Sequence, residues 1–313
     1  MPAPAVADRF AGCLLGLAVG DAFAAPFEGV PDWFILAEHG LPEQFMRTPL
    51  NDPMRYTDDT EMMIGVAECL ADRGRIDADD LIRRFAAHYT PNRGYGTGAR
   101  KILEAAQRGE DWNAVAETNF PGGSLGNGGA MRVAPVGLLF HQDLDAVWEQ
   151  AGKSAHPTHR HPVGIEAAQV MALAVALMVR SETVERRPFL KQLRERVTTE
   201  EMTWALDTAI GLRKGDQYSV LGSGLQAHRS VVTAIALFAA EKGDFRRAVG
   251  RCIALGDDTD TLSAMAGALC GALGGLAAVP PDLLAKLEDG PNGRTHIREL
   301  AERLYRRVGE PAA

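Results

Sequence analysis

The chain has 313 residues, enough for one large domain or two ordinary ones and for a sizeable core without stabilising cross-links. Hydrophobic residues make up 46% and charged residues 24%, a composition typical of a soluble globular protein and not of a disordered chain. The 33 basic and 41 acidic residues give a net charge of −8, which argues against a nucleic-acid-binding or anionic-membrane-binding protein.

The cysteines are widely separated and form no CxxC pair, so we expect neither a disulfide framework nor a structural zinc site, and a reducing, cytoplasmic location. No basic region followed by an apolar one marks a targeting segment at the N-terminus. The longest uncharged stretch, residues 261–279, is shorter and less apolar than the roughly 20 residues that span a bilayer. We therefore expect no membrane segment and interpret this stretch as a buried helix.

Helical periodicity dominates the chain. Apolar residues recur at helical spacing in residues 61–73, 166–179, 230–241, 261–276 and 297–307. Runs of alternating Val, Ile and Thr are missing and aromatic residues are only 6%, so strands have little support. We predict an all-α fold, a single compact multi-helix domain over residues 1–313 with its core at about 9–308, and a monomer.

Two acidic clusters each precede a predicted helix. In the first, residues 57–61, capping of the helix by Asp58 with Glu61 three positions later explains part of the pattern. The second, residues 256–261, places three acids in four positions, which is more than capping needs. Because neither cluster contains Lys or Arg, the like charges repel unless a cation lies among them.

The donors in both clusters are carboxylate and hydroxyl oxygens. Such ligands suit Mg²⁺, Mn²⁺ or Ca²⁺ and not zinc or copper. Asp58 and Asp59 together with Asp258 and Asp260 are enough to hold two ions, which can activate a water and orient a substrate. This hypothesis requires two clusters that are far apart in the sequence to meet in space.

Three further segments are candidates for binding or catalysis. Residues 122–129 contain five glycines in eight positions, typical either of a loop that presents N–H groups to phosphate or of a plain tight loop. Residues 156–161 contain three histidines, of which we expect one to face a substrate and two to begin a helix or lie on the surface. Glu28 follows an apolar stretch and is a candidate general base, although a lone glutamate is more often a surface residue.

Six segments, taken in chain order, resemble the ADP-ribosylglycohydrolase family. They are residues 12–21, 57–60, 126–132, 158–159, 221–224 and 258–262. Each segment alone is unremarkable, but the set in this order is highly specific and extends over about residues 9–280.

The resemblance implies a compact all-α fold with two Mg²⁺ ions (or Mn²⁺) in a cleft, and hydrolysis of the glycosidic bond between ADP-ribose and an acceptor. It implies that Asp59 or Glu28 activates the attacking water. The metal ligands that it implies are Thr57, Asp58, Asp59, Asp258, Asp260 and Thr261. The substrate-binding residues that it implies are Asp58, Gly122, Gly123, Ser124, Leu125, Gly126, Asn127, Gly128, His159 and Leu225.

The chain also departs from the family pattern. Asp257 stands where a small or amide residue is usual, and Leu125 stands where the serine-acting branch has a tyrosine. Residues 93–96 lack the acid of the nitrogenase-regulating branch, which lowers the weight of arginine-linked substrates.

We favour ADP-ribose linked through oxygen, to serine-type acceptors or as O-acetyl-ADP-ribose, with ADP-ribosylated proteins or small molecules as partners. An N-linked arginine or guanidine acceptor is the alternative. A non-catalytic ADP-ribose-binding protein and a phosphoesterase that cuts the diphosphate are alternatives of other classes. The mass of the product distinguishes these classes: free ADP-ribose indicates the hydrolase, AMP the phosphoesterase, and no product the binding protein.

Overall fold

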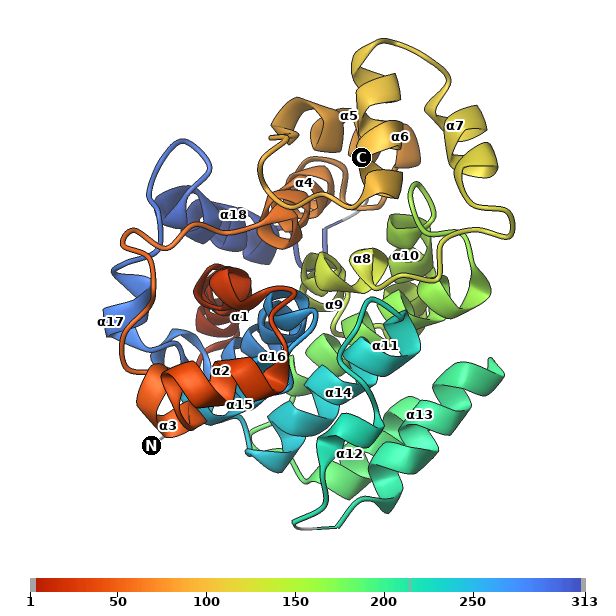
Figure 1. Cartoon of the computed structure of the whole chain (residues 1–313). Coiled ribbons are helices and arrows are strands. Elements are labelled where there is room, and N and C mark those ends of the chain that lie inside the picture. Colours follow the sequence, from red (N-terminus) through yellow and green to blue (C-terminus); the bar gives the residue numbers. More distant parts are fainter. Residues whose placement is uncertain (1–3, 214, 311–313) are drawn as a thin grey trace.

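The computed structural model describes residues 4–213 and 215–310 and is built from helices (Figure 1). Within these residues there is no β-strand, only isolated bridges between single residues. The prediction of an all-α fold is confirmed. The first three and last three residues of the predicted 1–313 domain lie outside the described residues, so its bounds stay a prediction.

The α-helices are α1 (Val6–Ala24), α2 (Asp32–His39), α3 (Pro42–Phe45), α4 (Asp58–Arg73), α5 (Ala78–His88), α6 (Thr97–Gln107), α7 (Trp112–Asn119), α8 (Gly128–Met131), α9 (Ala134–Leu139), α10 (Leu144–Ala155), α11 (Pro162–Val179), α12 (Arg186–Arg194), α13 (Glu200–Gly211), α14 (Ala227–Ala240), α15 (Phe245–Ile253), α16 (Thr259–Gly274), α17 (Pro281–Leu284) and α18 (Arg294–Arg306). Three short 3₁₀ turns, η1 (Ala25–Phe27), η2 (Tyr218–Val220) and η3 (Leu276–Ala278), connect some of them.

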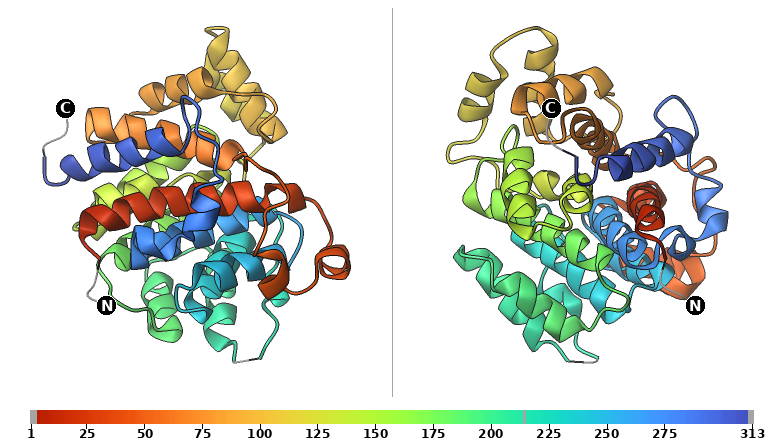
Figure 2. Two further views of the ribbon diagram at one scale, coloured as in Figure 1. Left: turned by 90° about the vertical axis from the view of Figure 1, so that its left-hand side faces the viewer. Right: turned by 180° about the vertical axis from the view of Figure 1, so that it is seen from behind.

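Helices α1 and α16 lie side by side at the centre of the molecule (Figures 1 and 2). Glycines allow their backbones to touch: a Cβ on Gly16 would lie 2.4 Å from the carbonyl oxygen of Gly267, and one on Gly20 would lie 2.2 Å from that of Ser263. A Cβ on Gly271 would lie 1.9 Å from the carbonyl oxygen of Gly12, so the two helices run antiparallel. The C-terminal end of α1 is therefore beside the N-terminal end of α16.

The remaining helices surround this central pair. Helix α18 packs against α1 and α4, while α11, α14 and α15 pack on α16. The α5–α7 segment lies at one end of the molecule and the α12–α13 pair at the other (Figure 2). This arrangement leaves the N-terminal ends of α4, α8 and α16 close together near the middle.

Two helical segments are long and apolar enough to cross a membrane, Val6–Phe27 and Pro162–Val179. Neither was predicted as a candidate span, because acids interrupt the uncharged runs in both segments. In the structure 89% and 78% of their most apolar windows are buried among other helices. They are thus interior helices of this fold, and length and composition alone are weak evidence for a membrane span.

All four cysteines carry free thiols and are buried. Cys13 is on α1 and Cys270 on α16, both in the core around the central pair. Burial raises the pKa of each of these two thiols far above its ordinary value. Neither is therefore a thiolate near neutral pH.

Candidate active site

A cavity of about 510 Å³ opens where the N-terminal ends of α4 and α16 converge. Its lining comes from seven separate parts of the chain. The lining residues are Glu28, Asp58, Asp59, Met62, Gly94, Gly96, Thr97, Gly98, Ala99, Phe120, Ser124, Gly126, Asn127, Gly128, Met131, Arg132, Thr158, His159, Leu225, Asp258, Asp260 and Thr261. Both acidic clusters and the glycine loop therefore contribute to one cavity.

Asp21 ties α4 to the end of α1. Its carboxylate is fully buried and accepts hydrogen bonds from the backbone N–H groups of Thr57 (3.0 Å) and Thr60 (3.1 Å) and from the Thr60 hydroxyl (2.5 Å). Burial raises the pKa of Asp21 to about 6, against the opposing effect of these donors. In the sequence Asp21 was visible only as the last residue of the motif at residues 12–21. Its position as a single acid near the end of a long apolar helix is the sequence signal for its contact with α4.

The start of α4 differs from the predicted capping pattern. Thr57, not Asp58, is the N-cap, and its hydroxyl accepts from the Asp59 N–H at 3.4 Å. The Glu61 carboxylate does not reach back to the cap. It accepts instead from the Tyr95 hydroxyl at 2.8 Å. Because Asp21 satisfies backbone donors at this helix end, Asp58 and Asp59 have their carboxylates free to line the cavity.

The start of α16 supplies the second group of acids. Asp258 is the N-cap position, and one of its carboxylate oxygens accepts from the side-chain amide of Asn127. One oxygen of Asp260 accepts from the Thr261 N–H at 2.9 Å. The Thr261 hydroxyl lies 3.4 Å from Oδ2 of Asp59, which links the two clusters directly.

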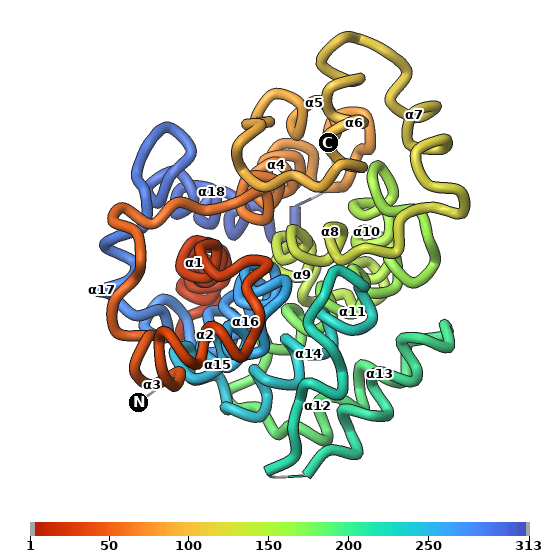
Figure 3. The backbone as a smooth tube through the Cα atoms, in the orientation of Figure 1, coloured from red at the N-terminus to blue at the C-terminus, as the bar shows by residue number. Residues whose placement is uncertain are grey.

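Glu28 reaches the same place from the segment after α1. The Gly29 N–H donates to the Asp257 carbonyl at 2.7 Å, and the Asp257 N–H donates to the Val30 carbonyl at 3.3 Å. This pairing holds the turn after α1 against the segment before α16 (Figure 3). Glu28, Asp258 and Asp260 each offer a carboxylate oxygen, and these oxygens all lie within 4.8 Å of one another.

Asp257 itself is outside the cluster. Its side chain is exposed, and Oδ2 accepts from the Ser223 hydroxyl at 2.9 Å. Its φ of 60° is in the left-handed region, where Asp and Asn are the non-glycine residues tolerated best. The extra acid noted in the sequence therefore shapes the turn before α16.

The electrostatics of the cavity favour a bound cation. Burial raises the pKa of Asp58, Asp59, Asp258 and Asp260, and repulsion between neighbouring carboxylates acts in the same direction. The pKa of Glu28 is also raised, by partial burial of its carboxylate at the cavity mouth and by Asp258. Oδ1 of Asp59 is buried without a hydrogen-bond partner. An orphaned carboxylate oxygen within a set of oxygen donors fits a hard divalent ion.

The glycine loop borders the opposite side of the cavity. Its backbone is fixed by two bonds to the segment before α14: Asn127 N–H to the Leu225 carbonyl (3.0 Å) and Ala227 N–H to the Leu125 carbonyl (3.1 Å). Leu225 is 67% exposed at the rim.

Some predicted site residues do not line the cavity. Gly123 packs on the histidine segment, since a Cβ there would lie 2.3 Å from the backbone nitrogen of His161. Gly122 and Leu125 are exposed beside it. Thr57 lies behind Asp59 as the helix cap, its hydroxyl 3.3 Å from Oδ2 of Asp59.

Of the three clustered histidines, only His159 lines the cavity. His161 caps α11, where its Nδ1 accepts from the Val163 N–H at 3.2 Å, and His156 is exposed at the end of α10. Burial and the nearby Arg132 guanidinium lower the pKa of His159 to about 3, so its ring is neutral at physiological pH.

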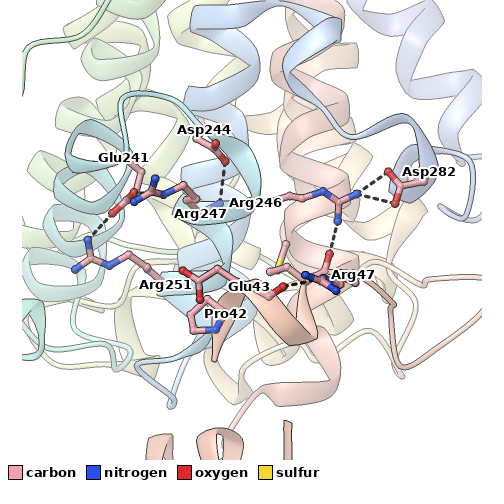
Figure 4. Close-up of a pocket in the computed structure, with 10 residues that line it drawn as sticks. Pro42, Glu43, Arg47, Glu241, Asp244, Arg246, Arg247, Arg251 and Asp282 are labelled. Atoms are coloured by element: carbon pink, nitrogen blue, oxygen red, sulfur yellow. Dashed lines mark hydrogen bonds and ion pairs between the residues drawn. The ribbon is translucent and has the colours of Figure 1, made fainter. Parts of the chain in front are cut away.

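A second cavity, of about 470 Å³, lies between α3, α15 and α17 (Figure 4). Three of its arginines are already paired with acids: Arg246 with Asp282 at 2.6 Å, and both Arg247 (2.7 Å) and Arg251 (2.6 Å) with Glu241. The fourth, Arg47, donates to the backbone carbonyl of Glu43 at 3.1 Å. It contains none of the predicted site residues. The cavity at the ends of α4 and α16 is therefore the candidate active site.

Comparison with known proteins identifies the family. A family model described as ADP-ribosylglycohydrolase matches residues 2–313. The chain is 34% identical to ADP-ribosylhydrolase ARH3 of Gallus gallus, over 90% of this chain and 88% of that protein. It is 33% identical to ADP-ribosylhydrolase ARH3 of Homo sapiens, over 96% and 93%.

A solved structure described as an ADP-ribosylglycohydrolase-related protein complex is similar over 97% of this chain and 99% of its own, with a TM-score of 0.74 and 28% sequence identity. The fold therefore agrees with the sequence matches. The chain belongs to the ADP-ribosylglycohydrolase family and is a hydrolase of the glycosidase type.

Proposed function

We propose that the protein is a Mg²⁺-dependent hydrolase that cleaves the glycosidic bond between ADP-ribose and an acceptor linked through oxygen. One observation carries this proposal: a single cavity has a group of oxygen ligands on one side and a glycine loop with a neutral imidazole on the other. The first side suits a metal and a sugar, and the second suits a diphosphate.

Asp58, Asp59, Asp258, Asp260 and Thr261 would hold two Mg²⁺ ions, or Mn²⁺, with Thr57 behind them. Such ions lower the pKa of a bound water and orient the hydroxyls of a sugar. The orphaned oxygen of Asp59 and the mutual repulsion of these acids support this assignment.

Proton transfer falls to Glu28 or Asp59. Glu28 combines an exposed position at the cavity mouth with a raised pKa, which brings a carboxylate closer to the range where it accepts and returns a proton. The remaining carboxylates stabilise the positive charge that develops on the anomeric carbon as the bond breaks.

The phosphate side is formed by Ser124, Gly126, Asn127 and Gly128 with His159. We assign Leu225 at the rim to an apolar contact with the ligand. The exposed ring of Phe120, also at the cavity, offers a second apolar surface.

The lining of the cavity favours an acceptor linked through oxygen. Its acids are Glu28, Asp58, Asp59, Asp258 and Asp260. The rim segment that includes Gly94, Gly96 and Thr97 contributes no carboxylate. A guanidinium acceptor is best recognised by a bidentate carboxylate, whereas a serine-type oxygen needs none.

The test is a panel of ADP-ribosylated serine peptide, O-acetyl-ADP-ribose, ADP-ribosylated arginine peptide and ADP-ribosylguanidine, with Mg²⁺ or with EDTA. We expect free ADP-ribose from the oxygen-linked substrates, identified by mass, and no product with EDTA. AMP and ribose phosphate would instead identify a phosphoesterase. Binding without any product would identify an ADP-ribose-binding protein.

A further inference from the structure

Arg132 is a fully buried charge directly beneath the phosphate side of the cavity. Its guanidinium lies 4.8 Å from the ring centre of Phe85, and its hydrogen-bond partners among the described residues are all neutral. Its Nη2 donates to the Ser154 carbonyl at 3.0 Å and to the Thr158 hydroxyl at 2.8 Å. A buried arginine whose partners are all neutral is unusual, which indicates that the orientation of its guanidinium toward these partners has a role.

The Thr158 hydroxyl connects this arginine to His159. Because a guanidinium can only donate, the Thr158 oxygen must accept from Arg132. The same oxygen lies 2.8 Å from Nδ1 of His159, and the hydroxyl hydrogen has no other acceptor among the described residues. Thr158 therefore donates to Nδ1, which leaves the single ring proton of His159 on Nε2.

We propose that Arg132 and Thr158 are positioning residues that hold His159 in the Nε2–H tautomer, with this N–H presented to a phosphate oxygen of the ligand. The nature of the ligand rests on the proposed function, whereas the tautomer rests on the hydrogen bonds alone.

The surroundings of Nε2 support this role. A Cβ on Gly128 would lie 3.0 Å from Nε2 and one on Gly126 would lie 3.4 Å from it, so the glycine loop leaves this atom uncovered. Arg132 is the charged group that faces His159, and Tyr95 and Asp58 in turn face Arg132. In this environment the imidazole stays neutral and donates one hydrogen bond. The other neutral tautomer would present a lone pair to an anionic oxygen and repel it.

The tautomer is measured directly by NMR on protein labelled with ¹⁵N-histidine. The chain has eight histidines, and loss of one signal set in His159→Gln assigns His159. We expect an unprotonated Nδ1 and a protonated Nε2 that do not change between pH 5 and pH 8. A protonated Nδ1 in the wild-type protein would overturn the proposal without any variant.

Variants of Thr158 test the relay. In Thr158→Val, which removes the hydroxyl, we expect a mixture of tautomers at His159, while Thr158→Ser should keep the wild-type pattern. With Mg²⁺ present, we expect ADP-ribose to bind Thr158→Val about tenfold more weakly by calorimetry, about 1.4 kcal/mol, and to bind Thr158→Ser as tightly as the wild type. Hydrolysis by Thr158→Val should show a larger change in KM than in kcat.

Unchanged tautomer and affinity in Thr158→Val would overturn the relay. If the wild-type protein shows the expected tautomer but binds no ADP-ribose, the proposed function fails while the assignment of the tautomer stands.

Discussion

Asp59 and Asp257 are both aspartates at or beside the candidate site, but their carboxylates have different surroundings. At Asp59, Oδ2 lies near two threonine hydroxyls while Oδ1 is buried and unpartnered. At Asp257 the carboxylate is exposed and paired with Ser223. An uncompensated buried carboxylate is costly, so Asp59 is expected to depend on a cation and Asp257 is not.

Asp59→Asn should therefore lose metal binding and turnover together. We expect kcat/KM to fall by more than about 100-fold, because even partners behind metal ligands commonly contribute 10–100-fold. Mg²⁺ titration by calorimetry and the hydrolysis assay check this, and circular dichroism checks the fold. Asp257→Asn is the matched control and should keep both properties, since Asn tolerates the same backbone conformation. Full activity in Asp59→Asn would contradict the assignment.

At the scale of single residues, the sequence predicted the site where several functional side chains stand close together in the chain. The two acidic clusters were visible because several acids stand together without a basic residue. Asp21, Arg132 and Thr158 were visible only as members of motifs, because their tasks depend on partners distant in the chain. Asp21 contacts the start of α4, and Arg132 contacts the end of α10 and the segment that follows it.

At the scale of the helix, the start of α4 shows capping from outside the helix. The predicted cap used residues of the same segment, Asp58 and Glu61. In the structure a carboxylate of α1 bonds the Thr57 and Thr60 N–H groups instead. Local pattern cannot reveal a partner 36 residues away. The predicted helices were correct in place and began a few residues late, since their first turns carry polar residues or proline without apolar periodicity.

Asp21→Asn should loosen α4 from α1. An amide has one accepting oxygen in place of two, so at least one donor at the start of α4 loses its partner. We expect a loss of about 1–3 kcal/mol in unfolding free energy, measured with urea, and weaker Mg²⁺ binding. Thr60→Val removes only the hydroxyl contact and should have a smaller effect on both. If Mg²⁺ affinity is unchanged in Asp21→Asn, Asp21 does not position the acids.

The contact between α1 and α16 requires glycine. Gly16→Val would place its Cβ against the Gly267 carbonyl and force the helices apart, with an expected cost of about 1–3 kcal/mol or more. Gly211→Ala is the control, because a Cβ there meets nothing within 4 Å, and it should be neutral or slightly stabilising. Thermal unfolding followed by circular dichroism compares the two. Equal melting temperatures would show that the helices can separate without loss.

At the scale of the whole molecule, the candidate site brings together acids from two parts of the chain that are far apart in the sequence. Residues 28, 58, 59, 258 and 260 meet although some two hundred positions separate the two clusters. Helical periodicity established the elements and the fold class, but it carries no information on which helix ends meet. The cavity follows from the packing of α1 against α16, which periodicity alone did not indicate.

This concentration of acids predicts how the metal-free protein responds to pH. The folded pKa of Asp21 is about 6, and those of Asp58, Asp59, Asp258 and Asp260 are also raised above the ordinary value near 3.8. The folded state therefore binds protons more tightly than the unfolded state, so this stabilisation is complete below about pH 4 and is lost as pH rises through 6 and above. Asp80, whose pKa is lowered to about 2 next to Arg84, changes stability only below this range.

We expect the melting temperature in EDTA to fall between pH 5 and pH 8, and Mg²⁺ to reverse the fall. Calorimetry at constant ionic strength measures both. Asp260→Asn should show a weaker pH dependence in EDTA than the wild-type protein. A metal-free melting temperature that rises over this interval would contradict the prediction.

Two of the four buried thiols can report on separation of the central helices. With Cys13 and Cys270 enclosed around the central helices, a thiol reagent can reach them only when α1 leaves α16. The same separation would carry the two groups of acids apart. The rate at which these two thiols are modified should therefore report how often the candidate active site comes apart. We expect this rate to fall when Mg²⁺ binds.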